Sequence, residues 1–408
     1  MYENLVNQEA GKLLTADIKH ERLPGAILFA GPEASGKLTA ALETARILSC
    51  HEKPQGKWTC SCPSCLQHKS LICSNLMLMG PRDCSLEISA AAKTFTEAHF
   101  INAKYIEAAR YLFLRSVRKL TLRFNGILWE GDSNLNKIGS LIEEINEQLE
   151  PLDFPRELPD VSQVKNICEE VSKLCMKLEN DFLYDSIPIN QVRNMEAWAH
   201  IKSEEGRKTV IIENAERMQT SVRNALLKIL EEPPEDVVFI LLTSKRNAIM
   251  QTILSRVRTY NFLDRTIEQQ GEVITRVFHN DDFKGNLNDY LLTYLPVTPN
   301  EIKGQARIFY NSIASKQICN LDEIVKKCEK FYPRIELKLF LYYIEQFMRP
   351  MFKSQAGSEA VVKAVELLRN CSDNITLYNQ TPLAALEILM RDMFALNNQF
   401  GGVFCAAM

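Results

Sequence analysis

A phosphate-binding loop is the clearest chemical motif of this chain. Residues 31–38 read GPEASGKL and hold the glycines and the lysine of a P-loop at the usual spacing, namely Gly31, Gly36 and Lys37. Small residues let successive backbone N–H groups surround phosphates, and the lysine neutralises their charge. The next position normally supplies a hydroxyl for Mg²⁺, but here it holds Leu38, for which Ser35 or Thr39 could substitute only imperfectly. The motif predicts P-loop ancestry with an impaired metal site.

An acidic pair should complete such a site at the end of a buried strand, where one carboxylate reaches Mg²⁺ and the next polarises the attacking water. The apolar stretch 209–213 ends in Glu213, which could reach the metal, but the following Asn214 cannot act as a base. We expect Glu216 to lie one turn away, on a helix surface. Since Leu38 is altered as well, the sequence argues against ATP hydrolysis by this chain and leaves open whether a nucleotide binds.

A cluster of four cysteines forms a second candidate site, consisting of Cys50, Cys60, Cys62 and Cys65. Four thiolates suit tetrahedral Zn²⁺ and leave no open position, so we predict a structural zinc ion rather than a catalytic one. In an intracellular protein, metal binding is favoured over disulfides. The Cys-x-Cys turn is tight, so a neighbour could replace one of the four ligands, and the candidates are His51, His68 and Cys73.

A sheet is needed to position these residues. Short apolar runs predict strands at 26–30, 76–79, 209–213 and 237–244. Apolar residues at helical spacing between and after them predict helices at 37–48, 189–201, 216–231 and 249–257. Such alternation is typical of a parallel α/β sheet covered on both faces. Thr243 and Ser244 end one strand, where a polar sensor residue or a simple turn would stand. From about residue 264 onward only helices are expected.

A long amphipathic region interrupts this alternation between about residues 85 and 185, and we interpret it as a helical insertion at the surface of the sheet domain. It carries a run of basic side chains, namely Arg110, Arg115, Arg118, Lys119 and Arg123. Such a run could contact DNA or a partner, but charge runs are more often a solvated helix face, and we favour that reading.

The composition is that of an ordinary soluble protein. The 408 residues are 46% hydrophobic and 24% charged, with a formal net charge of −3. This balance gives no global attraction to nucleic acid, so any DNA contact must come from a local patch or from partner subunits. No signal peptide and no apolar run long enough to span a membrane is visible, and we expect a cytoplasmic protein without membrane partners.

Several stretches together resemble the clamp-loader subunits of bacterial DNA polymerase III, a family of AAA+ proteins. They are LPGAILFAGPEASGK, the cysteine cluster, IPINQVR, TVIIENAERMQTSVRNALLKILEEPPEDVVFILLTS and TILSRVR. The resemblance covers about residues 1–80 and 185–265, and it is most specific from Asn214 to Arg256. Because Leu38 and Asn214 replace residues that the hydrolysing gamma/tau subunits keep, the chain is most similar to the delta-prime subunits, which are poor ATPases or none.

The resemblance implies a domain plan and a role for one arginine. It implies an AAA+ P-loop domain at 1–263 with a zinc module at about 50–73, a helical lid-like domain at 264–310 and a helical collar for oligomerisation at 311–408. In such loaders the arginine of a Ser-Arg motif enters the ATP site of the neighbouring subunit, and Arg256 occupies that position here, with Arg258 as its competitor.

The implied function is assembly with gamma/tau and delta subunits in a DNA polymerase III complex. That complex loads the sliding clamp onto primed DNA at the expense of ATP during replication. The alternative from the same family is a gamma/tau-type ATPase in which Glu213 and Thr39 restore the metal site. A third reading, a DNA-binding or regulatory module built on the insertion, has only the basic run in its favour.

Overall fold

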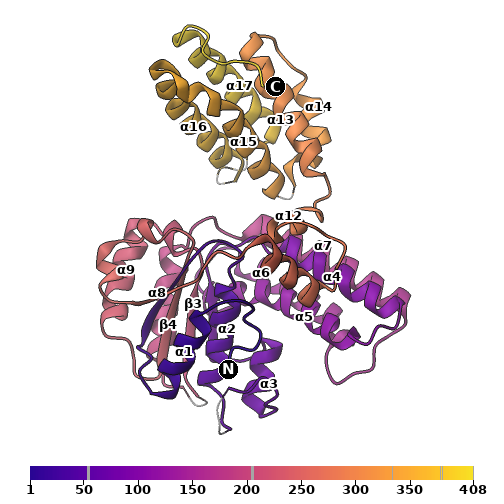
Figure 1. The fold of residues 1–408 in the computed structure, drawn as a ribbon, viewed down its shortest axis with the longest axis vertical. Coiled ribbons are helices and arrows are strands. Elements are labelled where there is room, and N and C mark those ends of the chain that lie inside the picture. The colour runs from indigo at the N-terminus through magenta and orange to yellow at the C-terminus, as the bar shows by residue number, and fades with distance from the viewer. Residues whose placement is uncertain (53–55, 204–205, 333, 377, 379, 408) are drawn as a thin grey trace. The chain divides into compact units, whose positions relative to one another are not determined.

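The computed structural model describes residues 1–52, 56–203, 206–332, 334–376, 378 and 380–407. The chain divides into two compact units, Met1–Tyr290 and Leu291–Met408. Figure 1 shows a sheet flanked by helices in the first unit and an arrangement of helices in the second.

The strands all belong to the first unit, and they are β1 (Ala26–Ala30), β2 (Leu76–Met79), β3 (Lys208–Ile212), β4 (Val237–Thr243) and β5 (Arg258–Asn261). The helices that begin before the unit boundary are α1 (Ala10–Lys19), α2 (Lys37–Leu48), α3 (Pro63–Ser70), α4 (Ser85–Phe100), α5 (Ile106–Thr121), α6 (Leu135–Leu149), α7 (Val161–Phe182), α8 (Ile189–His200), α9 (Thr220–Glu231), α10 (Gln251–Leu254), α11 (Ile267–Phe278) and α12 (Leu287–Leu292). Those beyond it are α13 (Pro299–Ser315), α14 (Leu321–Lys327), α15 (Arg334–Met348), α16 (Gln355–Thr376) and α17 (Pro382–Gln399).

The sheet is parallel throughout, in the order β2-β3-β4-β1-β5, which confirms the predicted α/β fold. Its inner strands are buried along their whole length and mainly apolar because both faces are covered. In register, Ala30 at the end of β1 pairs with Thr243 at the end of β4. The P-loop, the residue after β3 and the end of β4 therefore meet at the carboxyl edge of the sheet, the usual place for ligand sites in such folds.

Successive strand residues face two separate cores. Ile27 and Phe29 pack with α1 and α2 on one face, in a cluster that includes Leu38. Leu28 points to the other face, where α8 and α9 contribute residues to a second cluster. The alternation follows from the pleat of a strand, which sends neighbouring side chains to opposite faces.

The inserted helices α4 to α7 lie beside this second core rather than standing apart from it. Phe95, Phe113 and Val171 belong to the same buried cluster as Leu28. In Figure 1, α4, α5 and α7 run side by side, in agreement with their close packing. The insertion leaves the strand order intact, as expected, but its apolar side chains extend the core of the sheet domain.

The edge strand β5 was not predicted from the sequence. It reads RTYN, and Tyr260 is its one buried residue, so no apolar run marks it. The Tyr260 hydroxyl donates a hydrogen bond to Asp17 at 2.7 Å, which ties the strand to α1. A strand at the edge of a sheet needs only one paired side, and its pattern is correspondingly weak.

The second unit contains helices but no strand among its described residues, as the sequence predicted for this region. Its first helix, α13, begins with Thr298 and Glu301 in a reciprocal capping box, and Pro299 occupies the first turn. The assignment of residues 264–310 to a lid and 311–408 to a collar stays a prediction.

Candidate functional site

The P-loop connects β1 to α2 and is held tightly against the sheet. A Cβ on Gly31 would lie 2.3 Å from the Phe262 carbonyl oxygen, and Gly36 adopts a left-handed backbone conformation with φ 91°. Both positions therefore require glycine. Arg265, which sequence reasoning missed, braces the loop by donating to the Ala34 carbonyl at 2.5 Å and to the Val6 carbonyl at 2.8 Å.

The lysine of the loop turns back onto the loop itself. The Lys37 ammonium donates to the carbonyl oxygen of Gly31 at 2.6 Å, to that of Pro32, and to the Ser35 hydroxyl at 3.4 Å. Burial lowers its pKa to about 8, against the opposing effect of Glu216. The phosphate-binding cation of this site is thus engaged by the protein's own carbonyl groups.

The position after Lys37 contributes to the core instead of to metal binding. Leu38 is 6% exposed and packs in the cluster on the α1–α2 face of the sheet, whereas Thr39 is exposed. The Ser35 hydroxyl is buried and donates to the Pro32 carbonyl at 2.8 Å. The side chain at position 38 therefore offers no oxygen ligand for Mg²⁺.

Two arginines enclose the acid that follows β3. The Glu213 carboxylate accepts a hydrogen bond from Arg82 at 3.1 Å and another from Arg123, with which it forms a buried ion pair. Asn214 adopts a left-handed conformation and donates its amide to the Pro81 carbonyl. The residues at the two usual acidic positions thus bind protein groups.

A second carboxylate extends this network into the insertion. Glu87 on α4 accepts from Arg82 at 3.0 Å and from Lys119 on α5. Although burial opposes ionisation, Lys119 and Arg82 lower the pKa of Glu87 to about 2. Glu87 and Glu213 are thereby paired with three cations that come from the loop after β2 and from the α5 region.

The basic run of the insertion is neither a solvated face nor an open cationic patch. Besides the pairs above, Arg110 donates to the carbonyls of Leu152 and Asp153, and Arg118 binds the Asp153 carboxylate. Arg115 donates to the carbonyl of His68 at the end of α3. The expectation of a solvated surface is wrong because these side chains hold the insertion to its own loops, to α3 and to the acid after β3.

Glu216 also departs from expectation. It lies in a short 3-10 turn before α9 and accepts hydrogen bonds from the Thr243 hydroxyl at 2.8 Å and the Ser244 hydroxyl at 2.6 Å. These bonds lower its pKa against the effect of burial. The expected helix-surface position is wrong, since the carboxylate faces the ends of the strands near Lys37.

Arg256 lies just beyond α10, on the rim of the first unit. Its guanidinium donates to Glu231 through two nitrogens, at 3.0 and 2.8 Å, and to the Thr252 carbonyl at 2.8 Å. Its side chain is 28% exposed and that of Glu231 58%. Arg258 is instead paired with Asp17 at 2.8 Å, beside α1. The two candidate arginines thus have different partners.

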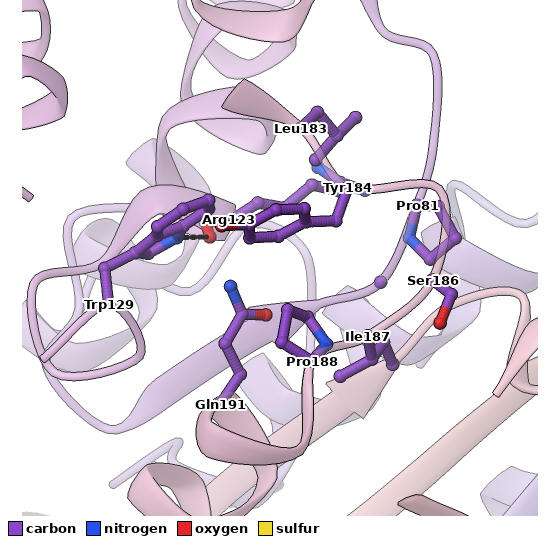
Figure 2. A pocket seen from close by; sticks show the side chains of 10 residues that line it. Pro81, Arg123, Trp129, Leu183, Tyr184, Ser186, Ile187, Pro188 and Gln191 are labelled. Atoms are coloured by element: carbon purple, nitrogen blue, oxygen red, sulfur yellow. Dashed lines mark hydrogen bonds between the residues drawn. The ribbon is translucent and has the colours of Figure 1, made fainter. Parts of the chain in front are cut away.

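A small pocket lies next to the buried Glu213 network. Figure 2 shows Trp129 and Tyr184 along one wall, with Gln191 and Pro188 facing them. The two aromatic rings stack with centroids 5.1 Å apart, and the Trp129 indole donates to the Arg123 carbonyl at 2.9 Å. Since Arg123 is 2% exposed, these residues help to shield its ion pair with Glu213 from water.

The four predicted cysteines come together between α2 and α3. The sulfur atoms of Cys50, Cys60, Cys62 and Cys65 all lie within 4.8 Å of one another. Those of Cys50 and Cys60 are 3.8 Å apart. Zinc–sulfur bonds of about 2.3 Å give a tetrahedron with edges of about 3.8 Å. Donor type and spacing therefore fit a metal ion held by four thiolates.

The alternative ligands lie outside this cluster. The His68 ring nitrogen Nδ1 is 3.5 Å from the sulfur of Cys73, so these two buried side chains contact each other. His51 is exposed. Among the described residues, the candidate metal-binding group consists of the four cysteines that the sequence predicts.

The geometry defines a P-loop-type α/β protein in which the residues at the usual metal-binding positions make other contacts. A family model described as "DNA polymerase III, delta subunit" matches residues 6–123 and 155–266, more than half of the chain. The chain belongs to this family. The matched ranges include the P-loop, the cysteine cluster and Arg256, and they leave out residues 124–154 of the insertion.

Curated relatives are similar over shorter stretches. The chain is 39% identical over 75 residues to the DNA polymerase III subunit gamma/tau of Mycobacterium tuberculosis, covering 16% of this chain and 13% of that protein. It is 37% identical over 76 residues to subunit delta' of Haemophilus influenzae, covering 18% and 23%. It is 38% identical over 80 residues to delta' of Pseudomonas aeruginosa, covering 19% and 24%. The matches thus span less than a quarter of each relative.

A solved DNA polymerase III gamma subunit-related protein from Thermotoga maritima has 17% identity and a TM-score of 0.25, with 56% of this chain and 90% of that chain covered. In the described part of the chain, no helix combines the length and the apolar character that a membrane span needs.

The Glu87 network predicts an acid-sensitive fold. Because the folded-state pKa of Glu87 is lowered, this carboxylate stabilises the fold above pH 4.5, and its contribution is lost as the pH falls toward 2. Between pH 5 and pH 3 the wild type should lose about 2 kcal/mol through this group. Urea unfolding at both pH values should show a smaller loss for Glu87→Gln.

The Glu87→Gln protein should also be less stable at pH 7, since Arg82 and Lys119 lose a partner. The matched control is Glu97→Gln, an exposed carboxylate on the same helix, which should follow the wild-type pH dependence. Equal losses in Glu87→Gln and the wild type would contradict the assignment.

Proposed function

We propose that this chain is a delta-prime-type clamp-loader subunit. It would assemble with gamma/tau and delta subunits and assist the ATP-dependent loading of a sliding clamp onto primed DNA, without hydrolysing ATP itself. The observation that carries this proposal is the engagement of Glu213 by Arg82 and Arg123. Moving this carboxylate to a metal ion would leave a buried arginine unpaired, which is costly.

The altered P-loop supports the same proposal. Leu38 is committed to the core, and Lys37 binds the carbonyl groups of its own loop. Magnesium-dependent phosphoryl transfer needs a hydroxyl at the position after the P-loop lysine, an acid to hold the metal ion and a group to orient the attacking water. With Asn214 at the second acidic position, several of these parts are altered together.

Arg256 is the residue we propose to act on ATP, in the site of a neighbouring subunit. Its partner Glu231 is largely exposed, and surface ion pairs of this kind contribute little to stability. The guanidinium can therefore exchange Glu231 for phosphate oxygens, which it can bind through two parallel hydrogen bonds. Negative charge developing on the transferred phosphoryl group would be stabilised in this way.

A gamma/tau-type ATPase is the alternative. It is favoured by the similarity to gamma/tau proteins, by the intact glycines and lysine of the P-loop, and by Glu216, which lies at the carboxyl edge of the sheet near Lys37. For this function, Lys37 would have to leave the carbonyl groups of its loop, and Glu216 would have to leave Thr243 and Ser244.

ATP turnover distinguishes the two. The isolated chain should hydrolyse ATP no faster than its Lys37→Ala variant. In a complex reconstituted with gamma/tau and delta, Arg256→Ala should lower DNA-stimulated turnover by about tenfold or more. Arg258→Ala is the matched control and should leave turnover near wild type, with co-purification verifying assembly of each complex.

Substantial turnover by the isolated chain, abolished in Lys37→Ala, would favour the ATPase alternative. Unchanged turnover of an intact Arg256→Ala complex would remove the arginine from its proposed role. Loss of turnover only in Arg258→Ala would transfer that role to Arg258.

We further propose that the four cysteines hold a structural Zn²⁺ ion. The bound ion would link the loop after α2 to the start of α3 and supply folding energy rather than chemistry. Its four sulfur ligands leave no position for a substrate. Cys65 is fully buried, so its thiolate would be protected from solvent and oxidants.

Protein purified without added metal should contain about one zinc per chain by elemental analysis. Cys65→Ser should lose the metal, because it removes one ligand. Cys73→Ser should retain it, since this buried cysteine contacts His68 outside the cluster. Less than about a tenth of an equivalent in the wild type, or zinc loss in Cys73→Ser, would contradict the proposed ligand set.

A further inference from the structure

We propose that Arg46 is a positioning residue for the metal ion of the four-cysteine cluster. It lies on α2, is 1% exposed, and directs Nη1 at the sulfur of Cys65 at 3.1 Å. The inference rests on the proposed zinc site and does not depend on the clamp-loader proposal.

The remaining donors of Arg46 fix its direction. Nε and Nη2 bind the carboxylate of Glu43, one turn earlier on α2, at 3.0 and 2.5 Å. Nη2 also binds the Gly56 carbonyl at 3.0 Å, and Nη1 binds the Lys57 carbonyl at 3.2 Å. Since the carboxylate takes one edge of the guanidinium, the other edge is aimed at the loop and at Cys65.

These contacts join the two halves of the cluster. Gly56 and Lys57 belong to the loop that leads to Cys60, while Cys65 lies in the first turn of α3. One planar group on α2 therefore holds both segments in place. A metal ion bound to four cysteines requires all four sulfurs at once, so fixing the two segments beforehand lowers the cost of ordering them.

Charge gives the contact a second purpose. Four thiolates around a divalent ion carry a net charge of −2, and three of these cysteines are buried. A hydrogen bond from a cation to a metal-bound thiolate offsets part of this charge. Lys69 adds a further cation, since its ammonium donates to the Cys60 carbonyl at 2.7 Å and lies over the Trp58 ring, as does Arg46.

The chemistry of the guanidinium distinguishes arginine from lysine here. Arginine can bind Glu43, two carbonyls and a sulfur in one plane, whereas an ammonium has only three donors at a single point. Arg46→Lys should therefore keep the charge but lose part of the geometry, and Arg46→Met should lose both.

The experiment measures metal retention directly. Zinc-loaded full-length protein is mixed with a chromophoric chelator and the rate of zinc transfer is recorded. Losing a hydrogen bond to a metal ligand typically costs about 10–100-fold in metal affinity. We expect transfer at least about tenfold faster in Arg46→Met and an intermediate rate in Arg46→Lys.

The control is Arg115→Met. Arg115 donates to the backbone carbonyls of His68 and Lys69 in α3, so its removal should leave zinc transfer within about threefold of wild type. If zinc transfer from Arg115→Met were accelerated as much as from Arg46→Met, general loosening of α3, and not the contact with Cys65, would control zinc retention. That result would overturn the proposal.

A second readout separates charge from fold. In cobalt-substituted protein, the sulfur-to-cobalt absorption band reports thiolate binding to the metal. The pH at which half of this absorption is present should be higher by about half a unit or more in Arg46→Met, because the thiolates lose a stabilising cation. The midpoint in Arg46→Lys should lie between those of the wild type and Arg46→Met.

An unchanged midpoint and an unchanged transfer rate in folded Arg46→Met, even with a lower melting temperature, would overturn the proposal by leaving Arg46 a purely structural role. If Arg46→Met does not fold, the zinc-transfer rate and the cobalt midpoint of Arg46→Lys test the proposal. Wild-type values of both in that variant would overturn it.

Discussion

The ion pairs of Glu213 determine how the rest of the first unit can work. This carboxylate stands at the end of β3, at the edge where a P-loop protein gathers its metal ligands, yet it binds Arg82 and Arg123. A buried acid with two cationic partners is hard to release, since removal of one member leaves the others unpaired in a low dielectric. The same contact that fastens the insertion to the sheet therefore occupies a position that hydrolysis would need.

Other features follow from this constraint. With Glu213 bound to two arginines, a hydroxyl at position 38 would lack its partner in holding a metal ion. Leu38 packs in the core there instead. Lys37 donates to the carbonyl groups of its own loop. Arg256 is different, since its ion-pair partner among the described residues, Glu231, is largely exposed. An arginine paired in this way can exchange its partner for a group on another molecule, which is the role that we propose for Arg256.

Local patterns predicted a large part of the fold. The strand at 26–30 and the helix at 37–48 have the expected bounds because their apolar spacing is a property of the segment itself. The cysteine cluster was found for the same reason, since its four ligands lie close in sequence. By contrast, β5 escaped prediction because its pairing with β1, and not its composition, makes it a strand.

The partners of the candidate site could not be predicted in this way. Glu213 is separated from Arg123 by 90 positions and from Arg82 by 131, and nothing in a basic helical stretch says whether its cations face water or a buried acid. Likewise, Glu216 stands near the strand ends because a 3-10 turn delays the start of α9. These are consequences of tertiary packing, which a reading of local periodicity does not contain.

The most direct test of the central claim is a calorimetric titration of the purified chain with ATP in the presence and absence of Mg²⁺, repeated with Glu213→Gln. If Glu213 serves structure, any ATP affinity that is measured should be the same with and without Mg²⁺, and Mg²⁺ should not produce binding where there is none without it. A contrary result would be ATP binding that Mg²⁺ tightens by about tenfold or more, with this gain lost in folded Glu213→Gln. It would show that the carboxylate leaves its arginines to hold a metal ion.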